Sequence, residues 1–533
     1  MTRKAGVARQ LAFWFLVLMG MWAVAGQARP KNLLAAQRVV GRSGNAPEKT
    51  AAERFAERAE TLVTAAPVNK GAWGLLVVDA ATGETLYEKN ADHYFTPASN
   101  MKLLTTALAL DKLGPDYRFR TTVETHGTIT QGVLAGDLIL VGRGDPNLSN
   151  RKFPFDTKEE FDGPPEKVLN ELADQVVAHG VKEISGDIVA DDSYFPRDRY
   201  PDGWEIDDMV WEYGAAISAI VVDDNAVTVT LTPGEKPGDP TIAVVDPATS
   251  DFTLKDQATT AEKLEKSDKS DKSEKSDLTL VREPGSNTVL LTGTLPAKSA
   301  PRKLVLAIQE PAQHAAIAMA RLLADRGVKF HGSVRANHDP DTAEASRTVL
   351  AEHVSLPLGT TLKLVNKISQ NLHTEILLRT AARQQGRWTT SDDLLKFPEE
   401  FYARVGIAPG DVVQEDGSGL SRHDLVTPRA FVALLHYAQR QTWFPVYFDS
   451  LPVAGIDGTL SDRMKKAGMA GRIHAKTGSV EHVRTLSGYA DTPGGRRLIF
   501  SFLSNNESVK EHEVHDALDG LCLAMMEELD LKK

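Results

Sequence analysis

Hydrophobic and polar positions alternate differently in the first, middle and last parts of the chain. In the first part, an amphipathic stretch at residues 51–62 precedes two strand-like runs at 73–79 and 84–88, separated by a turn. These patterns predict a helix followed by a β-hairpin. A helix that is apolar over most of its surface is expected next. It should start near Thr96 and Pro97, because threonine caps helices and proline suits the first helical position.

The last part of the chain, after about residue 355, returns to helical spacing and ends in strand-like runs. Three such runs lie at 473–479, 484–490 and 497–503, and a final helix is expected at 510–529. The two ends of the chain together predict an α+β domain in which helices cover an antiparallel sheet.

The middle part, residues 121–345, is dominated by short β-like runs. We therefore expect two β-rich inserted domains, II and III, between the halves of a catalytic domain formed by residues 51–120 and 346–533. A tract of alternating Lys, Ser and Asp lies within the insertion and buries no apolar surface. It predicts a disordered loop at 255–278.

The first 28 residues have the features of a secretory signal peptide. Arg3, Lys4 and Arg9 precede an apolar stretch, and Ala23 and Ala25 fit an A-x-A cleavage site. The alternative is an uncleaved anchor, although the stretch is shorter than the ~20 residues that a spanning helix needs. Residues 29–50 lack periodicity and predict a flexible lead. The expected location is the periplasm, with loose membrane association left open.

Composition narrows the function classes. The 533 residues carry a net charge of −11, with no basic stripe of the kind that binds nucleic acid. The single cysteine, Cys522, lies in an apolar run and is expected to be a buried small hydrophobe. No motif indicates a metal or another cofactor.

The first chemical motif is Ser-x-x-Lys, formed by Ser99 and Lys102. Residues i and i+3 share a helix face, so the lysine can reach the serine hydroxyl. A buried lysine with a lowered pKa can activate that serine as a nucleophile. About two chance copies are expected in such a length. The second copy, Ser149 and Lys152, lies in a polar loop and is set aside.

The second motif is Ser-x-Asn, formed by Ser369 and Asn371 just before an apolar helix. The hydroxyl can relay a proton to a leaving amine, and the amide can hold a substrate carbonyl. A helix-capping role for Ser369 is the alternative.

The third motif is Lys476-Thr477-Gly478-Ser479, on a predicted strand. Its lysine and hydroxyls suit the capture of a carboxylate, and its glycine permits close backbone approach. The N–H groups of Ser479 and Ser99 are expected to form an oxyanion hole.

Ser-x-x-Lys, Ser-x-Asn and Lys-Thr-Gly in this order are the motif set of penicillin-binding proteins and serine β-lactamases. The chain resembles the class C low-molecular-mass penicillin-binding proteins, a D-Ala-D-Ala carboxypeptidase/endopeptidase family (peptidase S13), over most of residues 50–530. The long gap between the first two motifs and the stretches 138–146, 186–195 and 416–422 add to this resemblance.

The resemblance implies a penicillin-binding-protein-like catalytic fold and a set of residue roles. Ser99 is then the acylated nucleophile and Lys102 its base. Arg422 is implied near the pocket for the substrate side chain, with a structural ion pair as the alternative. Asp208 and Tyr213 are implied to contact the amino end of that side chain, and an ordinary loop carboxylate is the alternative for Asp208.

The resemblance also implies the partners: peptidoglycan stem peptides as substrates and β-lactams as covalent inhibitors. The choice between carboxypeptidase and endopeptidase activity stays open, as does the oligomeric state. Two other functions also stay open: a β-lactamase or esterase on the same fold, and a non-catalytic wall-binding β-lactam sensor.

Overall fold

The computed structural model describes residues 49–530 except 155–159, 165, 263–276, 341–345, 388–389 and 466–467. The predicted signal peptide, and the lead as far as residue 48, lie outside these residues. The ends of the chain build one five-stranded antiparallel sheet, in the order β2-β1-β23-β22-β21. Its strands are β1 (Ala72–Asp79), β2 (Thr85–Lys89), β21 (Ile473–Val480), β22 (Val483–Asp491) and β23 (Arg497–Asn505).

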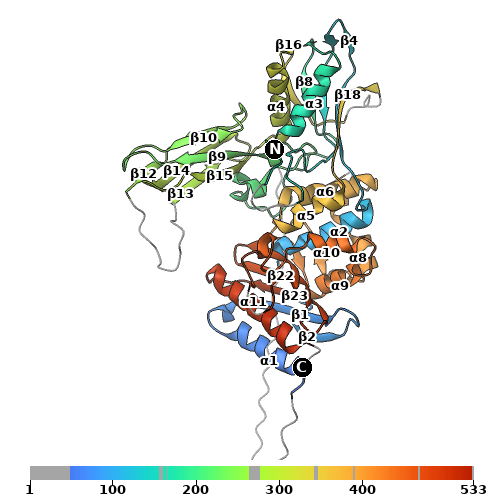
Figure 1. The fold of residues 1–533 in the computed structure, drawn as a ribbon, viewed down its shortest axis with the longest axis vertical. Helices are drawn as coiled ribbons and strands as arrows, with labels where there is room; N and C mark the ends of the chain where they lie inside the picture. Colours follow the sequence, from blue (N-terminus) through green and yellow to red (C-terminus); the bar gives the residue numbers. More distant parts are fainter. Residues whose placement is uncertain are drawn as a thin grey trace, which may run out of the picture. The chain divides into compact units, whose positions relative to one another are not determined.

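Two terminal helices, α1 (Ala51–Thr64) and α11 (Glu511–Glu528), contact each other and cover one face of this sheet (Figure 1). α1 begins at a capping box in which Thr50 and Glu53 bond each other's backbone amides. Cys522 is fully buried in the apolar layer between these helices and the sheet, as expected. The three strand-like runs expected at the end of the chain are thus present as β21, β22 and β23.

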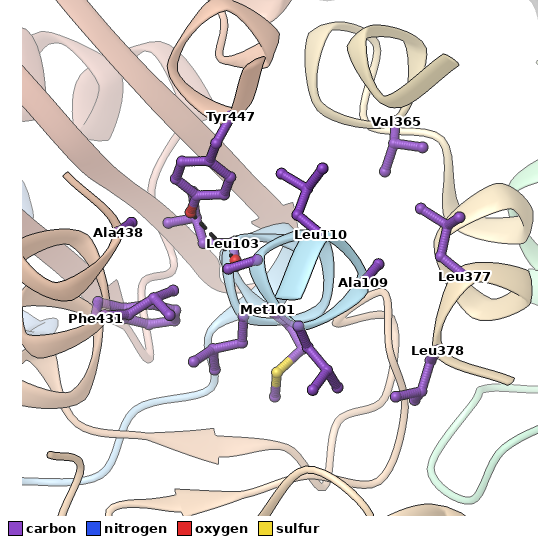
Figure 2. Close-up of a cluster of buried hydrophobic side chains, with 14 of the residues drawn as sticks. Met101, Leu103, Ala109, Leu110, Val365, Leu377, Leu378, Phe431, Ala438 and Tyr447 are labelled. Atoms are coloured by element: carbon purple, nitrogen blue, oxygen red, sulfur yellow. Dashed lines mark hydrogen bonds between the residues drawn. The ribbon is translucent and has the colours of Figure 1, made fainter. Parts of the chain in front are cut away.

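A second apolar layer surrounds α2 (Met101–Leu113), whose first ten residues are all buried. Figure 2 shows Met101, Leu103 and Leu110 of α2 enclosed by side chains of neighbouring helices, and Tyr447 donates to the carbonyl oxygen of Leu103 at 3.2 Å. The surrounding helices are α5 (Leu358–Lys367), α6 (Asn371–Gln384), α7 (Ser391–Lys396), α8 (Glu399–Val405), α9 (Pro428–Ala438) and α10 (Phe444–Ser450). A two-stranded ribbon, β19 (Val412–Val413) with β20 (Leu425–Val426), completes this part.

The first inserted module contains helices as well as strands. Its sheets run β16-β7-β5-β4 and β17-β8-β6-β3-β18, and α3 (Lys167–Ala178) and α4 (Pro311–Asp325) share their core. The strands are β3 (Arg120–Thr125), β4 (Thr128–Thr130), β5 (Val133–Ala135), β6 (Leu138–Val141), β7 (Glu183–Ile184), β8 (Ile188–Asp191), β16 (Lys329–Phe330), β17 (Val334–Asn337) and β18 (Thr348–Val354).

The pairing of β18 with β3 carries the first module past residue 345, the expected boundary. We therefore propose that the inserted segment ends after Val354.

The second inserted module is all-β and has its own apolar core. Its sheets run β10-β9-β15 and β11-β14-β12, with β13 also paired to β14. The strands are β9 (Ala226–Thr232), β10 (Ile242–Asp246), β11 (Thr253–Asp256), β12 (Thr259–Ala261), β13 (Asp277–Arg282), β14 (Thr288–Pro296) and β15 (Arg302–Ala307). The two ends of the expected loop 255–278 therefore lie largely in strands, because they pair with β14; residues 263–276 lie outside the described residues.

Within the described residues, no helix combines the length and apolarity that crossing a membrane requires.

Candidate active site

Ser99 lies in a short 3-10 turn (Ala98–Asn100) immediately before α2. The helix was expected to start at Thr96 and Pro97, but it starts at Met101. Ala98 has a φ of +47°, a left-handed conformation that interrupts the helix and that L-residues rarely adopt. Such strain is typical of functional turns and persists only where the surroundings enforce it. Here Gly419 approaches so closely that a Cβ on it would lie 1.8 Å from the carbonyl oxygen of Ala98.

Lys102 points back at this turn and is fully buried. Its Nζ donates to Ser99 Oγ at 2.9 Å, to Asn371 Oδ1 at 2.6 Å and to the carbonyl oxygen of Ser418 at 2.6 Å. Three acceptors use all three N–H groups of a protonated ammonium. The first two motifs therefore meet at one nitrogen.

Burial lowers the pKa of Lys102 to about 7, although the carboxylates of Asp416, Glu375 and Asp424 each pull the pKa upward. A lysine with this pKa is largely neutral just above pH 7. It can then accept a proton from the hydroxyl beside it. The buried lysine that the sequence predicted is present. The acidic groups that raise its pKa lie outside the three motifs.

Two of those acidic groups hold the loop that carries the Ser418 carbonyl. Asp416 Oδ1 accepts from the Gly419 N–H at 2.5 Å, across the peptide bond whose oxygen faces Lys102. Glu375 Oε1 accepts from the N–H groups of Gly417 and Ser418, both at 2.8 Å. The backbone around Ser418 is thus fixed from behind by buried carboxylates.

Ser369 forms a second serine–lysine pair with Lys476. Lys476 is fully buried on β21, and its Nζ donates to Ser369 Oγ at 2.9 Å. Burial, followed by the nearby charge of Lys102, holds the pKa of Lys476 well below its usual value. Ser369 has a φ of +63°, and the N-terminal cap of α6 is Gln370. The helix-capping alternative for Ser369 is therefore wrong.

The edge strand β21 passes directly beside the nucleophile. A Cβ on Gly478 would lie 2.1 Å from Thr485 Oγ1 and 3.0 Å from the backbone nitrogen of Ser99, so only glycine permits this approach. Thr477 and Thr459 share a hydrogen bond of 2.7 Å between their hydroxyls. Ser479 is exposed, and its side chain lines the same cavity as Ser99.

A cavity of about 680 Å³ opens in front of these groups. Eight of the residues selected from the sequence line it, and the other three, Lys102, Lys476 and Gly478, lie directly behind its wall. The eight lining residues are Ser99, Asp208, Tyr213, Ser369, Asn371, Arg422, Thr477 and Ser479.

One wall of the cavity is acidic and comes from the inserted segment. Carboxylate oxygens of Glu205, Asp207 and Asp208 all lie within 4.8 Å of one another. Burial, followed by the neighbouring Asp208, raises the pKa of Tyr213. Arg422 donates to the carbonyl oxygen of Glu481 at 2.6 Å and to Glu205 at 3.3 Å. The wall thus suits a cationic group, and Arg422 is partly engaged in an ion pair.

Several lining residues were not singled out from the sequence, among them Thr459, Arg463, Glu511 and His515. Glu511 and His515 lie one turn apart on α11, whereas Thr459 and Arg463 precede β21, so only the fold brings the two pairs together. The rejected copy of the first motif lies elsewhere, since buried Ser149 accepts a hydrogen bond from the Asp224 N–H at 2.6 Å.

Comparison with known proteins identifies the family to which this sequence and fold are similar. A family model described as D-Ala-D-Ala carboxypeptidase 3 (S13) family matches residues 57–525. The chain is 35% identical to a D-alanyl-D-alanine carboxypeptidase of Actinomadura sp. (strain R39) over 447 residues, which cover 82% of this chain and 78% of that protein.

The fold is also similar to a solved structure, penicillin binding protein 4 (dacB) of Haemophilus influenzae. The TM-score is 0.75 at 25% identity, covering 88% of this chain and 99% of that chain. The same protein is also solved in complex with a β-lactam, with a TM-score of 0.70 at 25% identity, covering 89% of this chain and 99% of that chain. The α+β penicillin-binding-protein fold expected from the sequence is confirmed.

Proposed function

Because the chain belongs to the D-Ala-D-Ala carboxypeptidase 3 (S13) family, we propose that it is a serine-type D-alanyl-D-alanine carboxypeptidase that β-lactams inhibit. The observation that carries this proposal is the 2.9 Å hydrogen bond between Lys102 Nζ and Ser99 Oγ inside a buried site. It pairs a nucleophile with a base whose pKa of about 7 suits neutral pH.

Acylation begins when neutral Lys102 removes the proton of Ser99 as its Oγ attacks the carbonyl between two D-alanines. Negative charge then develops on the carbonyl oxygen. The backbone N–H groups of Ser99 and Ser479 are the proposed donors to that oxygen. The close approach of β21 at Gly478 supports this assignment, because it brings the strand's backbone to the Ser99 turn.

Expulsion of the terminal D-alanine requires a proton on its nitrogen. Ser369 Oγ is the proposed donor, held in place by its hydrogen bond from Lys476. The proton that Lys102 took from Ser99 replaces the one that Ser369 gives up, so Lys102 becomes neutral again. The C–N bond breaks, D-alanine leaves, and the rest of the peptide stays as an ester on Ser99. Water then attacks the ester as Lys102 accepts its proton. Lys102 passes that proton to Ser99 Oγ as the ester C–O bond breaks, and the shortened peptide leaves with a new carboxylate.

The substrate is proposed to be the stem peptide of peptidoglycan. Asp208, with Glu205 and Asp207 beside it, supports recognition of an amino group on the residue before the two D-alanines. Lys476, Thr477 and Ser479 on β21 are the proposed receptors for the terminal carboxylate. Such a substrate requires export, which agrees with the expected signal peptide and a periplasmic location.

The alternatives differ in what happens after acylation. A β-lactamase would release hydrolysed penicillin quickly, and a sensor would acylate but cleave no peptide. Release of D-alanine from N,N′-diacetyl-L-lysyl-D-alanyl-D-alanine tests the proposal directly. Release by the native protein, with none by Ser99→Ala, is expected; peptide left intact by a penicillin-acylable protein would favour the sensor.

Endopeptidase activity uses the same residues and depends on whether the cleft admits a crosslinked peptide. A purified crosslinked muropeptide dimer offered under the same conditions distinguishes the two activities.

A further inference from the structure

A second cavity, of about 270 Å³, lies behind the acidic wall of the active site. The segment 205–210 separates the two cavities. Glu205, Asp207 and Asp208 line the active-site cavity, whereas Ile206, Met209 and Val210 line the second one. Residues of one turn thus alternate between two cavities, and an occupant of the second would contact the back of the substrate-binding wall.

The second cavity is also lined by Arg282, the last residue of β13. This arginine is buried, with only 5% of its surface exposed. Its Nη2 donates to the carbonyl oxygen of Ala307 at 2.5 Å, and its Nη1 to that of Met209 at 3.5 Å. Its Nε is buried and has no hydrogen-bond partner among the described residues. A guanidinium has five N–H donors, so Nη1 and Nη2 each keep one further N–H, whereas Nε is shielded from solvent.

Arg282 makes no ion pair with any carboxylate of the described residues, and burial lowers its pKa to about 10. Arg199, which lines the same cavity, differs because Glu310 pairs with it at 2.9 Å. A buried charge without a partner is costly, so buried cations are normally paired. Besides two carbonyl oxygens, the guanidinium of Arg282 faces the ring of Phe252, 5.8 Å from its centroid. None of these partners neutralises its charge, so Arg282 can attract an anion.

We propose that this cavity binds a small carboxylate that carries a short apolar group. The carboxylate would accept from the remaining N–H groups of Nη1 and Nη2 of Arg282, a bidentate geometry that favours arginine over lysine. The apolar group would pack on Ile206, Met209 and Val210. Tyr200 also lines the cavity, and its hydroxyl is shielded from solvent, which raises the pKa of that group. Glu283, in the same lining, is exposed.

This site is separate from the catalytic groups, so it goes beyond the proposed function. An occupant would restrain the segment 205–210, and with it Asp208, which faces the substrate. The ligand could be a free small acid or the carboxyl end of a peptide, and two probes distinguish these sources: propionate and N-acetyl-D-alanine.

The test follows the methyl resonance of Met209, a lining residue, in protein labelled with ¹³C at the methionine methyl groups and assigned with Met209→Leu. Titration with propionate should shift this resonance saturably, and propionamide, its neutral isostere, should not shift it. Arg282→Met should abolish the effect. Arg282→Lys, which keeps the charge but not the fork, should weaken binding about tenfold. The measurement needs no turnover, so its outcome is independent of the proposed activity.

Tighter binding of N-acetyl-D-alanine than of propionate would identify a peptide end as the ligand; the reverse order would identify a free acid. Either order supports the site. The proposal is overturned if neither probe shifts Met209, or if Arg282→Met and Arg282→Lys respond as the native protein does. Arg282 would then serve only to bond the carbonyl oxygens of Ala307 and Met209.

Discussion

The side chain of Asn371 connects the catalytic lysine to the inserted segment at Tyr213. Its Oδ1 accepts from Lys102 at 2.6 Å, and its Nδ2 donates to the carbonyl oxygen of Tyr213 at 2.8 Å. The orientation of the amide is therefore fixed from both sides. The inserted segment supplies a wall of the cleft and also holds a residue that contacts the base. Variants in either part should affect acylation.

The pH dependence of acylation should report Lys102. Its neutral form is the base, and burial places its pKa near 7. The acylation rate should therefore rise with pH through about 7 and then level off. Lys102→Arg, which stays protonated, should lower the rate by about 10²–10⁴-fold. Stopped-flow measurement with a chromogenic cephalosporin checks both.

A matched control for that variant is Lys465→Arg, since the side chain of Lys465 is 55% exposed and pairs with a surface carboxylate, Asp462. It should leave the profile unchanged. A native profile that rises only near pH 10 would contradict the account of Lys102.

Asp416 should affect the pH dependence of the acylation rate. Among the groups that raise the pKa of Lys102, Asp416 is the strongest. Asp416→Asn removes that negative charge, so the pKa of Lys102 should fall and the acid limb should move to lower pH. The variant should also lose stability, by about 1–3 kcal/mol, because Asp416 accepts several buried hydrogen bonds.

Asp424→Asn serves as the comparison for Asp416. Burial, followed by Asp416, raises the pKa of Asp424 well above its usual value. Among the three acidic groups that raise the pKa of Lys102, Asp424 has the smallest effect, so its replacement should move the acid limb less. Equal shifts in the two variants would show that the effect arises from general loosening of the loop.

Ser369→Ala should slow peptide cleavage more than it slows acylation by a β-lactam. The amine that leaves from a peptide needs a proton, and the Ser369–Lys476 pair supplies it in this account. A loss of about 10²–10⁴-fold in kcat/KM for the peptide is expected. Ser149→Ala is the control: it removes a buried serine from the rejected motif copy and should lower the melting temperature without changing the rate.

Asp208→Asn should change substrate preference. The acidic wall attracts a cationic side chain, so the variant should raise KM for a lysine-containing peptide and leave kcat nearly unchanged. With an acetylated lysine at the same position, native and variant should have similar kcat/KM. An equal loss for both peptides would assign Asp208 a structural role.

The sequence predicted the catalytic residues well because each motif is local. Ser99 and Lys102 are three residues apart, so their contact follows from a single helical turn. Ser418 and Glu375 were missed, because their roles depend on one backbone carbonyl and on contacts between distant segments. The helix start was misplaced at Thr96 and Pro97, because local capping rules do not include the left-handed Ala98 that packing enforces.

In the inserted domains, too, local helices could be predicted from the sequence, but contacts between distant segments could not. Buried residues of α3 follow helical spacing (Val168, Leu169, Leu172, Ala173 and Val176), so this window of the sequence alone could have predicted the helix. The pairing of β18 with β3 could not be predicted, because it joins strands more than 200 residues apart. Arg282 also carries no local signal, since its missing partner is apparent only in the folded chain.

The most direct test of the central claim is the intact mass of the purified protein with and without benzylpenicillin, beside Ser99→Ala. The account predicts a stable adduct with the mass of the intact drug on the native protein and none on the variant. An adduct on both would place acylation elsewhere than Ser99. No adduct, with the drug left intact, would contradict the assignment of Ser99 and Lys102 as nucleophile and base.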